Sequence, residues 1–144
     1  MIEQRFAGRR LNQEKIETAL NTILAILESQ AEVGFAYLHG SVLDFQRGEQ
    51  LVLPHDIDVA VYLTGGDWVG TALKMQLQFY RSTGLTPEVF DVHPLNNAPL
   101  EAVIEIIKHG KLLFCRDSLL HSDFLENVSN TRRRLSGILE AAHG

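Results

Sequence analysis

The sequence predicts an α/β (α+β) domain in which helices alternate with the strands of one small mixed sheet. Three observations favour this class. Short stretches rich in β-branched residues recur along the chain, stretches with apolar residues at helical spacing lie between them, and Gly or Pro separates most of these segments. No internal repeat, low-complexity tract or linker interrupts the pattern, so residues 1–144 are interpreted as a single domain.

The first half of the chain predicts a helix, a strand, a short helix and a second strand. Asn12 can cap the first helix, whose apolar residues recur at helical spacing: Ile16, Ala19, Leu20, Ile23, Leu24 and Leu27. Residues 35–38 form a short buried strand that ends at a Gly-Ser turn, and residues 42–45 begin a short helix. After a polar loop, alternation and β-branched residues predict a strand over 57–63.

The second half continues this alternation. Asp67 caps a helix that carries apolar residues on one face, namely Val69, Ala72, Leu73, Leu77 and Tyr80. A third strand covers 89–92, a third helix opens around Pro99 and ends at Gly110, and a fourth strand covers 111–115. The remainder, from Ser118 onward, is predicted to be helical.

Composition narrows the function classes. Hydrophobic residues make up 45% and charged residues 22%, as in soluble globular proteins. Thirteen Lys and Arg against 18 Asp and Glu give a net charge of −5, so we expect no direct nucleic-acid binding. The one cysteine, Cys115, fits a reducing compartment, and no stretch has the pattern of a signal peptide or membrane span. We therefore expect a cytoplasmic domain that does not associate with membranes.

Two aspartates open the predicted strand "DIDVAVYL". Because strand side chains alternate between faces, Asp56 and Asp58 project to one side and Ile57 and Val59 to the other. Two like charges this close repel each other unless a cation lies between them, and carboxylate oxygens at this spacing suit one or two Mg²⁺ ions. For the pair alone, a solvated strand edge is the simpler interpretation.

A third aspartate favours a metal site over a solvated strand edge. Asp91 lies within the apolar stretch "PEVFDVHPL", and a carboxylate in a buried strand is costly unless something compensates it. If this strand neighbours residues 57–63, Asp91 joins the first two aspartates on one face. Three such carboxylates form a two-metal site of the kind used for phosphoryl and nucleotidyl transfer. A capping or surface aspartate is the structural alternative.

The turn "HGS" suits an anion, and the nearby histidines suggest a second possibility. A strand that ends at Gly40 and Ser41 and turns into a helix presents N–H groups and a hydroxyl to a phosphate. Zinc binding by His39, His55 and His93 is an alternative, but their spacing matches no recognisable zinc motif, so they are interpreted as polar residues at strand ends. The run at 132–134 is interpreted as a solvated helix face, with RNA or a partner as the alternative.

With these motifs in place, the chain resembles the minimal nucleotidyltransferase (MNT) group of the DNA polymerase β superfamily. The resemblance rests on "LHGS", "DIDVAVYL", "VFDVHPLNNAPL" and "IIKHGKLLFCRD", which occur in the family's order. It implies a polymerase β-like fold in which Gly40 and Ser41 hold the β- and γ-phosphates of ATP. It also implies that Asp56 and Asp58 bind the catalytic Mg²⁺ ions and that Asp91 is the third carboxylate, beside the acceptor hydroxyl.

The sequence departs from the family pattern in the segment between the Gly-Ser turn and the first aspartate. This segment, residues 42–55, is longer than usual, and Val42 stands where the family often has a basic residue. Arg47 is the candidate substitute for a phosphate contact, with an exposed loop arginine as the equally plausible alternative. His55 stands where a serine is common.

The resemblance also implies a partner. Stand-alone MNT domains are similar to the antitoxins of HEPN–MNT toxin–antitoxin pairs, which transfer AMP from ATP to a tyrosine of a HEPN ribonuclease toxin. We therefore expect a metal-dependent protein adenylyltransferase. The first alternative is a non-catalytic antitoxin that blocks its toxin by contact alone. The second is a small-molecule nucleotidyltransferase that works as a homodimer.

Overall fold

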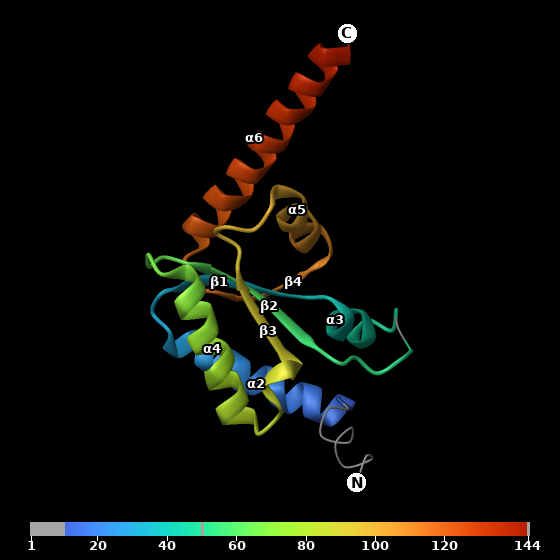
Figure 1. Cartoon of the computed structure of the whole chain (residues 1–144), viewed down its shortest axis with the longest axis vertical. Helices are drawn as coiled ribbons and strands as arrows, with labels where there is room; N and C mark the ends of the chain where they lie inside the picture. Colours follow the sequence, from blue (N-terminus) through green and yellow to red (C-terminus); the bar gives the residue numbers. More distant parts are fainter. Residues whose placement is uncertain (1–10, 50, 144) are drawn as a thin grey trace.

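The computed structural model describes residues 11–49 and 51–143. Residues 1–10, where the sequence begins without a signal-peptide pattern, lie outside the described part, as do Gln50 and Gly144. A four-stranded mixed sheet runs through the middle of the molecule, with helices on both of its faces (Figure 1). The predicted α/β (α+β) class is therefore confirmed.

The sheet contains β1 (Val33–His39), β2 (Ile57–Leu63), β3 (Phe90–Pro94) and β4 (Lys111–Cys115) in the spatial order β3-β2-β1-β4. The strand β1 is antiparallel to both of its neighbours, β2 and β4, whereas β2 and β3 are parallel. The bounds of β2 and β4 are those predicted. The third strand starts one residue later than predicted, because a short 3₁₀ turn, η1 (Pro87–Val89), takes up Val89.

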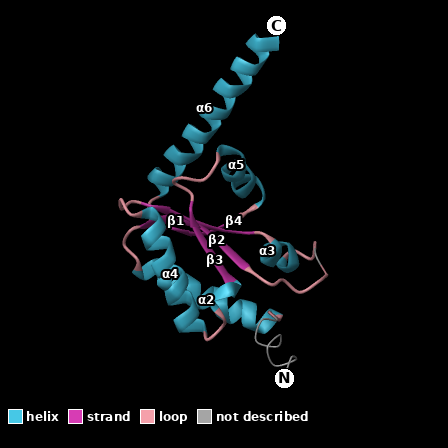
Figure 2. Ribbon diagram, in the orientation of Figure 1, coloured by secondary structure: helices cyan, strands magenta, loops and turns pink. Residues whose placement is uncertain are grey.

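The helices also follow the predicted order. The first described helix, α2 (Gln13–Ser29), begins at Asn12, whose side chain accepts a hydrogen bond from the Lys15 N–H at 2.8 Å. Next come α3 (Ser41–Gln46), α4 (Trp68–Thr83), α5 (Leu100–His109) and α6 (Ser118–His143). Figure 2 shows α2 and α4 on one side of the sheet and α5 with the start of α6 on the other. We call these sides the covered face and the open face.

The covered face is an apolar core. The strand β2 contributes Ile57, Val59, Val61 and Leu63 to it, and all four are buried. Two aromatic side chains join α4 to β3, where the rings of Phe79 and Phe90 meet edge to face with their centroids 5.8 Å apart. Burial of this alternate set of strand residues fixes the register of β2 and turns its other residues toward the open face.

The predicted apolar face of α4 is wrong. The side chains that pack on the sheet are Ala72, Met75 and Phe79, whereas four of the five predicted residues are exposed: Val69, Leu73, Leu77 and Tyr80. The physical reason is that α4 carries apolar residues over more than one face. Both sets have helical spacing, so the position of the helix on the sheet decides which of them is buried.

On the open face, aromatic rings fasten the start of α6 to the sheet. The ring of Phe35 stacks on Tyr62 with a centroid distance of 4.9 Å, and Phe124 of α6 packs against both. The imidazole Nε2 of His121 lies 2.6 Å from the Tyr37 hydroxyl oxygen. Beyond this contact α6 projects away from the sheet (Figures 1 and 2). No helix within the described residues is long and apolar enough to span a membrane.

Candidate active site

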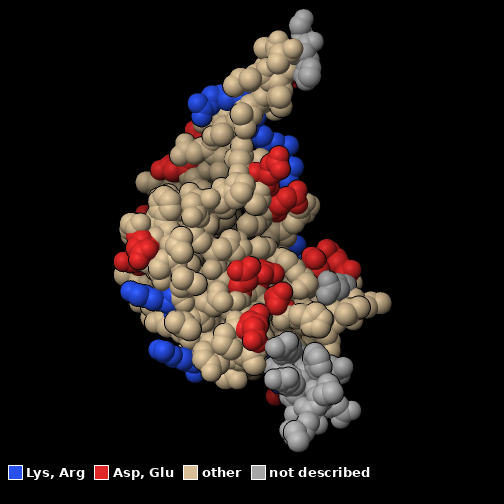
Figure 3. Space-filling view, in the orientation of Figure 1, with Lys and Arg blue, Asp and Glu red and all other residues tan. Residues whose placement is uncertain are grey.

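Two of the three predicted metal ligands lie side by side. Since β2 and β3 are parallel and in register, Asp58 and Asp91 are direct partners across the two strands. Their side chains point to the open face, opposite the buried set of β2. The expectation that these two strands are neighbours is confirmed. In the view of Figure 3, acidic side chains gather over the region of β3.

The surroundings of these aspartates differ from the prediction in two respects. Asp56 lies in the loop immediately before β2 rather than within the strand, and its side chain is exposed. Asp91 was expected in a buried strand, but its side chain is 64% exposed. That expectation is wrong because β3 is the edge strand of the sheet, so one flank of the strand is open to water.

The carboxyl group of Asp58 is the electrostatic centre of the site. Burial, followed by the nearby charges of Asp91 and Asp56, raises the pKa of Asp58 to about 6. A hydrogen bond between the Asp58 and Asp91 carboxyl groups contributes to the same shift. The Asp58 and Asp91 carboxyl groups therefore lie close enough for their negative charges to repel each other.

This donor set fits a divalent cation of the Mg²⁺ type. Within the described residues, no three or more His, Cys, Asp or Glu side chains already converge on one point as metal ligands. The two hydrogen-bonded carboxyl groups nevertheless offer hard oxygen ligands at one place, with Asp56 close enough to shift the pKa of Asp58. A cation there would stabilise both groups in their ionised form.

Gly40 lies against the Asp58 carboxyl group. Its φ of 78° is in the region that favours glycine, and a Cβ at this position would overlap Oδ2 of Asp58. The next residue, Ser41, begins α3, whose first N–H groups have no acceptor within the helix. The predicted Gly-Ser turn therefore lies directly beside the carboxylates.

Two histidines complete this surface, His39 at the end of β1 and His93 near the end of β3, in agreement with the interpretation of both as polar residues at strand ends. His39 is the register partner of Asp58 across β1 and β2, and its ring meets that of His93 edge to face at a centroid distance of 5.0 Å. Burial, with the nearby His93, lowers the pKa of His39 to about 4. The alternation of strand side chains indicates this arrangement in the sequence, because it places His93 on the same face as Asp91.

Other candidate residues lie elsewhere. The guanidinium of Arg47 donates a hydrogen bond to the backbone carbonyl of His109 at the end of α5, so it is engaged with the backbone and not with a carboxylate. His55 is exposed on the loop before β2, and the arginines at 132–134 lie on the projecting part of α6. The structure thus gathers the aspartates and two histidines but not the predicted basic residues.

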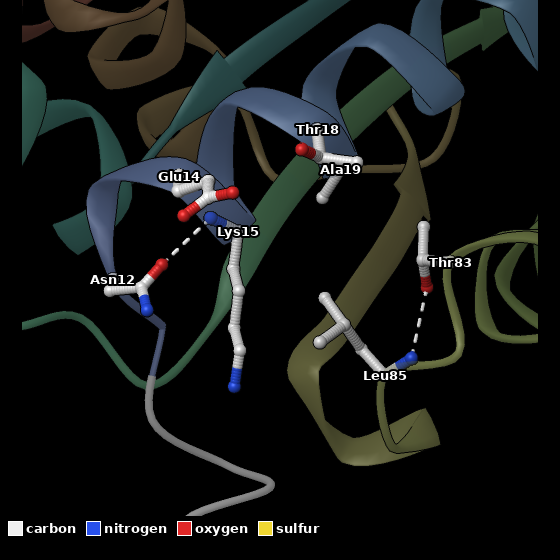
Figure 4. A pocket seen from close by; sticks show the side chains of 7 residues that line it. All are labelled: Asn12, Glu14, Lys15, Thr18, Ala19, Thr83 and Leu85. Atoms are coloured by element: carbon white, nitrogen blue, oxygen red, sulfur yellow. Dashed lines mark hydrogen bonds between the residues drawn. The ribbon is translucent and has the colours of Figure 1, made fainter.

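A pocket with a volume of about 250 Å³ lies apart from these residues, beside the first turns of α2 and the segment that follows α4 (Figure 4). Glu14 is the single carboxylate among its lining residues. The full lining consists of Asn12, Glu14, Lys15, Thr18, Ala19, Thr83 and Leu85. Without a cluster of acidic or nucleophilic side chains, this pocket is not a candidate for the chemistry.

Solved structures share this fold. One contains a tri-AMPylated HEPN toxin from Shewanella oneidensis in complex with MNT antitoxin; the matched chain is 16% identical, with a TM-score of 0.62 over 88% of this chain and 93% of that chain. A second is the toxin–antitoxin MntA–HepT, at 16% identity and a TM-score of 0.55 over 89% and 99%. A third is a toxin–antitoxin with AMP-PNP, at 18% identity and a TM-score of 0.53 over 93% and 100%.

Sequence comparison gives the family. No curated protein matches the chain. The profile of the family described as "Polymerase beta, Nucleotidyltransferase", however, matches residues 21–119, which include the Gly-Ser turn and all three aspartates. The chain therefore belongs to the polymerase β nucleotidyltransferase family.

Proposed function

We propose that this chain is a metal-dependent protein adenylyltransferase that transfers AMP from ATP to a tyrosine hydroxyl of a HEPN ribonuclease toxin and thereby neutralises it. The observation that carries the proposal is the register pairing of Asp58 with Asp91 beside Gly40, on the open face of the sheet. The fold similarity to toxin–antitoxin complexes, one with an AMPylated toxin and one with AMP-PNP, supports the choice of partner and nucleotide.

The triphosphate would lie on the turn at Gly40 and Ser41. Because Gly40 has no side chain, a phosphate oxygen can approach the backbone next to Asp58. The N–H groups at the start of α3 and the Ser41 hydroxyl can donate hydrogen bonds to it. Arg47 would reach the phosphates only after leaving the His109 carbonyl, so we assign it a secondary role.

The aspartates would hold the metal and position the acceptor. Asp56, Asp58 and Asp91 are the proposed ligands of Mg²⁺, which supplies neutralisation of the charge that develops on the phosphates and on the attacking oxygen. Asp91 is the most exposed of the strand carboxylates and faces the side from which an acceptor would approach. Its place at the sheet edge leaves room for a side chain that projects from another protein.

The transfer itself is a single displacement at phosphorus. A bond forms between the acceptor oxygen and the α-phosphorus, the bond from that phosphorus to the bridging oxygen of the β-phosphate breaks, and pyrophosphate leaves. The acceptor hydroxyl loses its proton to the surrounding carboxylates or to water. The protein mainly aligns the two reactants and stabilises charge.

The direct experiment mixes purified HEPN toxin, this protein, Mg²⁺ and ATP labelled at either the α- or the γ-phosphate. We expect α-label on the toxin, a mass increase of one or more AMP units and loss of ribonuclease activity. Transfer of γ-label would identify a kinase instead. Inhibition of the toxin without any mass change would favour the non-catalytic antitoxin.

A further inference from the structure

The helix α4 has a second apolar face, which is largely exposed to solvent. It consists of Val69, Leu73, Leu77 and Tyr80, which are 56%, 57%, 47% and 38% exposed, and we call it the α4 stripe. The stripe runs along most of the helix, although α4 already buries a separate set of residues on the sheet. A contiguous apolar surface of this kind is typical of a site where another protein binds.

One hydrogen bond shows where this stripe lies. Gln76 has helical neighbours in Leu73 and Tyr80, three and four residues away, and its Oε1 accepts a hydrogen bond from the Val92 N–H of β3 at 3.2 Å. The stripe therefore borders the edge strand of the sheet. Asp91 precedes Val92 on that strand and points to the open face, so the stripe and the carboxylates lie at the same sheet edge, on either side of β3.

The charged residues of α4 itself are of one sign, whereas the carboxylates of Asp67 and Glu32 lie beside its first turn. Between its bounds α4 contains Lys74 and Arg81, both exposed, and no acidic residue, although the whole chain has a net charge of −5. Figure 3 shows uncharged surface over α4 with basic side chains at its outer rim and acidic side chains on the β3 side. A partner that fits this surface has an apolar face with carboxylates along the flank that meets the basic rim.

We propose that the α4 stripe and the adjoining edge of β3 are the docking surface for the protein acceptor, which binds through an apolar helix face flanked by carboxylates. This rests on the proposed function, because it takes the acceptor to be a protein. Docking beside β3 brings the acceptor's hydroxyl-bearing residue next to Asp91. A second copy of this chain fits less well, because a two-fold contact would place basic helices of two acidic molecules against each other.

The test uses the purified HEPN toxin as probe and the variants Leu73→Glu and Leu77→Glu, which change exposed side chains. We expect the Kd for the toxin, measured by calorimetry without ATP, and the KM for the toxin to rise roughly tenfold or more. The KM for ATP and kcat at saturating toxin should stay within about twofold of wild type, because the nucleotide site is untouched. Leu119→Glu, at an apolar residue of α6 that is 70% exposed, is the matched control.

Charge reversal gives a second readout. The double variant Lys74→Glu with Arg81→Glu should associate with the toxin more slowly, and its association rate should depend less on salt. The charge-conserving variant Lys74→Arg with Arg81→Lys should keep the association rate and the salt dependence of the wild type. Unchanged Kd and KM in the leucine variants would overturn the docking surface. Self-association of the wild-type protein that Leu73→Glu abolishes, with toxin binding retained, would overturn it in favour of a homodimer.

The outcomes for docking and for chemistry are separable. If the wild-type protein binds the toxin but transfers no AMP, the proposed function fails while the calorimetric comparison still decides the surface. If the wild-type protein does not bind the toxin at all, the docking proposal fails as well. Transfer that proceeds at wild-type KM in both leucine variants would leave the proposed function standing and remove the docking surface.

Discussion

The two faces of the sheet are built from the same strands but from different chemistry. The covered face, under α2 and α4, is an apolar core that includes Val59 and Phe79. The open face carries two aspartates, two histidines and a tyrosine–histidine contact, and each of the four groups with a shifted pKa among the described residues lies there. Both faces bury apolar side chains, but only the open face also bears the cost of partly buried, mutually repelling polar groups. Substitutions should separate these two effects.

The largest expected effect is on the open face. Asp56→Asn with Asp58→Asn removes the proposed metal ligands, and we expect the transfer rate to fall about 10³-fold or more while the fold persists. The thermal midpoint without metal should stay the same or rise, because repulsion beside Asp91 is relieved. Asp123→Asn on α6 is the control. A double variant that transfers AMP at the wild-type rate would place the site elsewhere.

On the covered face, Phe79→Ala should cost about 3–5 kcal/mol of unfolding free energy, because the ring is fully buried and packs on Phe90. Leu77→Ala, on the same helix but exposed, should change it by only about 0.5 kcal/mol. Urea unfolding of both variants measures the difference. Equal losses would mean that α4 does not pack through the face described above.

Gly40→Ala tests the closeness of the turn to the carboxylates, and Gly48→Ala is its matched partner. Both residues have positive φ, 78° and 74°, so both substitutions carry a backbone cost of about 1–3 kcal/mol, and the ψ of −159° at Gly40 is one that residues with a Cβ rarely adopt. A Cβ at Gly40 overlaps the Asp58 carboxyl group, whereas one at Gly48 meets nothing within 4 Å. We expect transfer to drop roughly 100-fold in the first variant only, in single-turnover measurements with Mg²⁺ and ATP.

The smallest effect concerns pH. Burial lowers the pKa of His121, so the folded protein favours its neutral form. The stability that neutral His121 contributes through its contact with Tyr37 is fully present above about pH 6.5. It declines as the pH falls below that value, because the unfolded chain then binds the proton more readily. His121→Gln should flatten part of the decline in thermal midpoint between pH 7 and pH 5.

The order of elements and the caps at Asn12 and Asp67 could be predicted because they depend on local spacing. The pairing of Asp58 with Asp91 needed one non-local step, the adjacency of two strands. The buried face of α4 could not be predicted, since two sets of residues have helical spacing and the position of the sheet decides between them. The exposure of Asp91 likewise depends on the strand order, which no short stretch encodes.

The close contact at Gly40 limits which substitutions this position can tolerate during evolution. Every amino acid that a single-base change can substitute for glycine carries a Cβ, and at this position any Cβ meets the Asp58 carboxyl group. No single-base change at this codon that replaces glycine gives a residue without a Cβ. Lineages that retain the transfer activity would therefore keep this glycine, because a compensating change at Asp58 would remove a proposed metal ligand. We therefore expect few substitutions to be accepted at position 40.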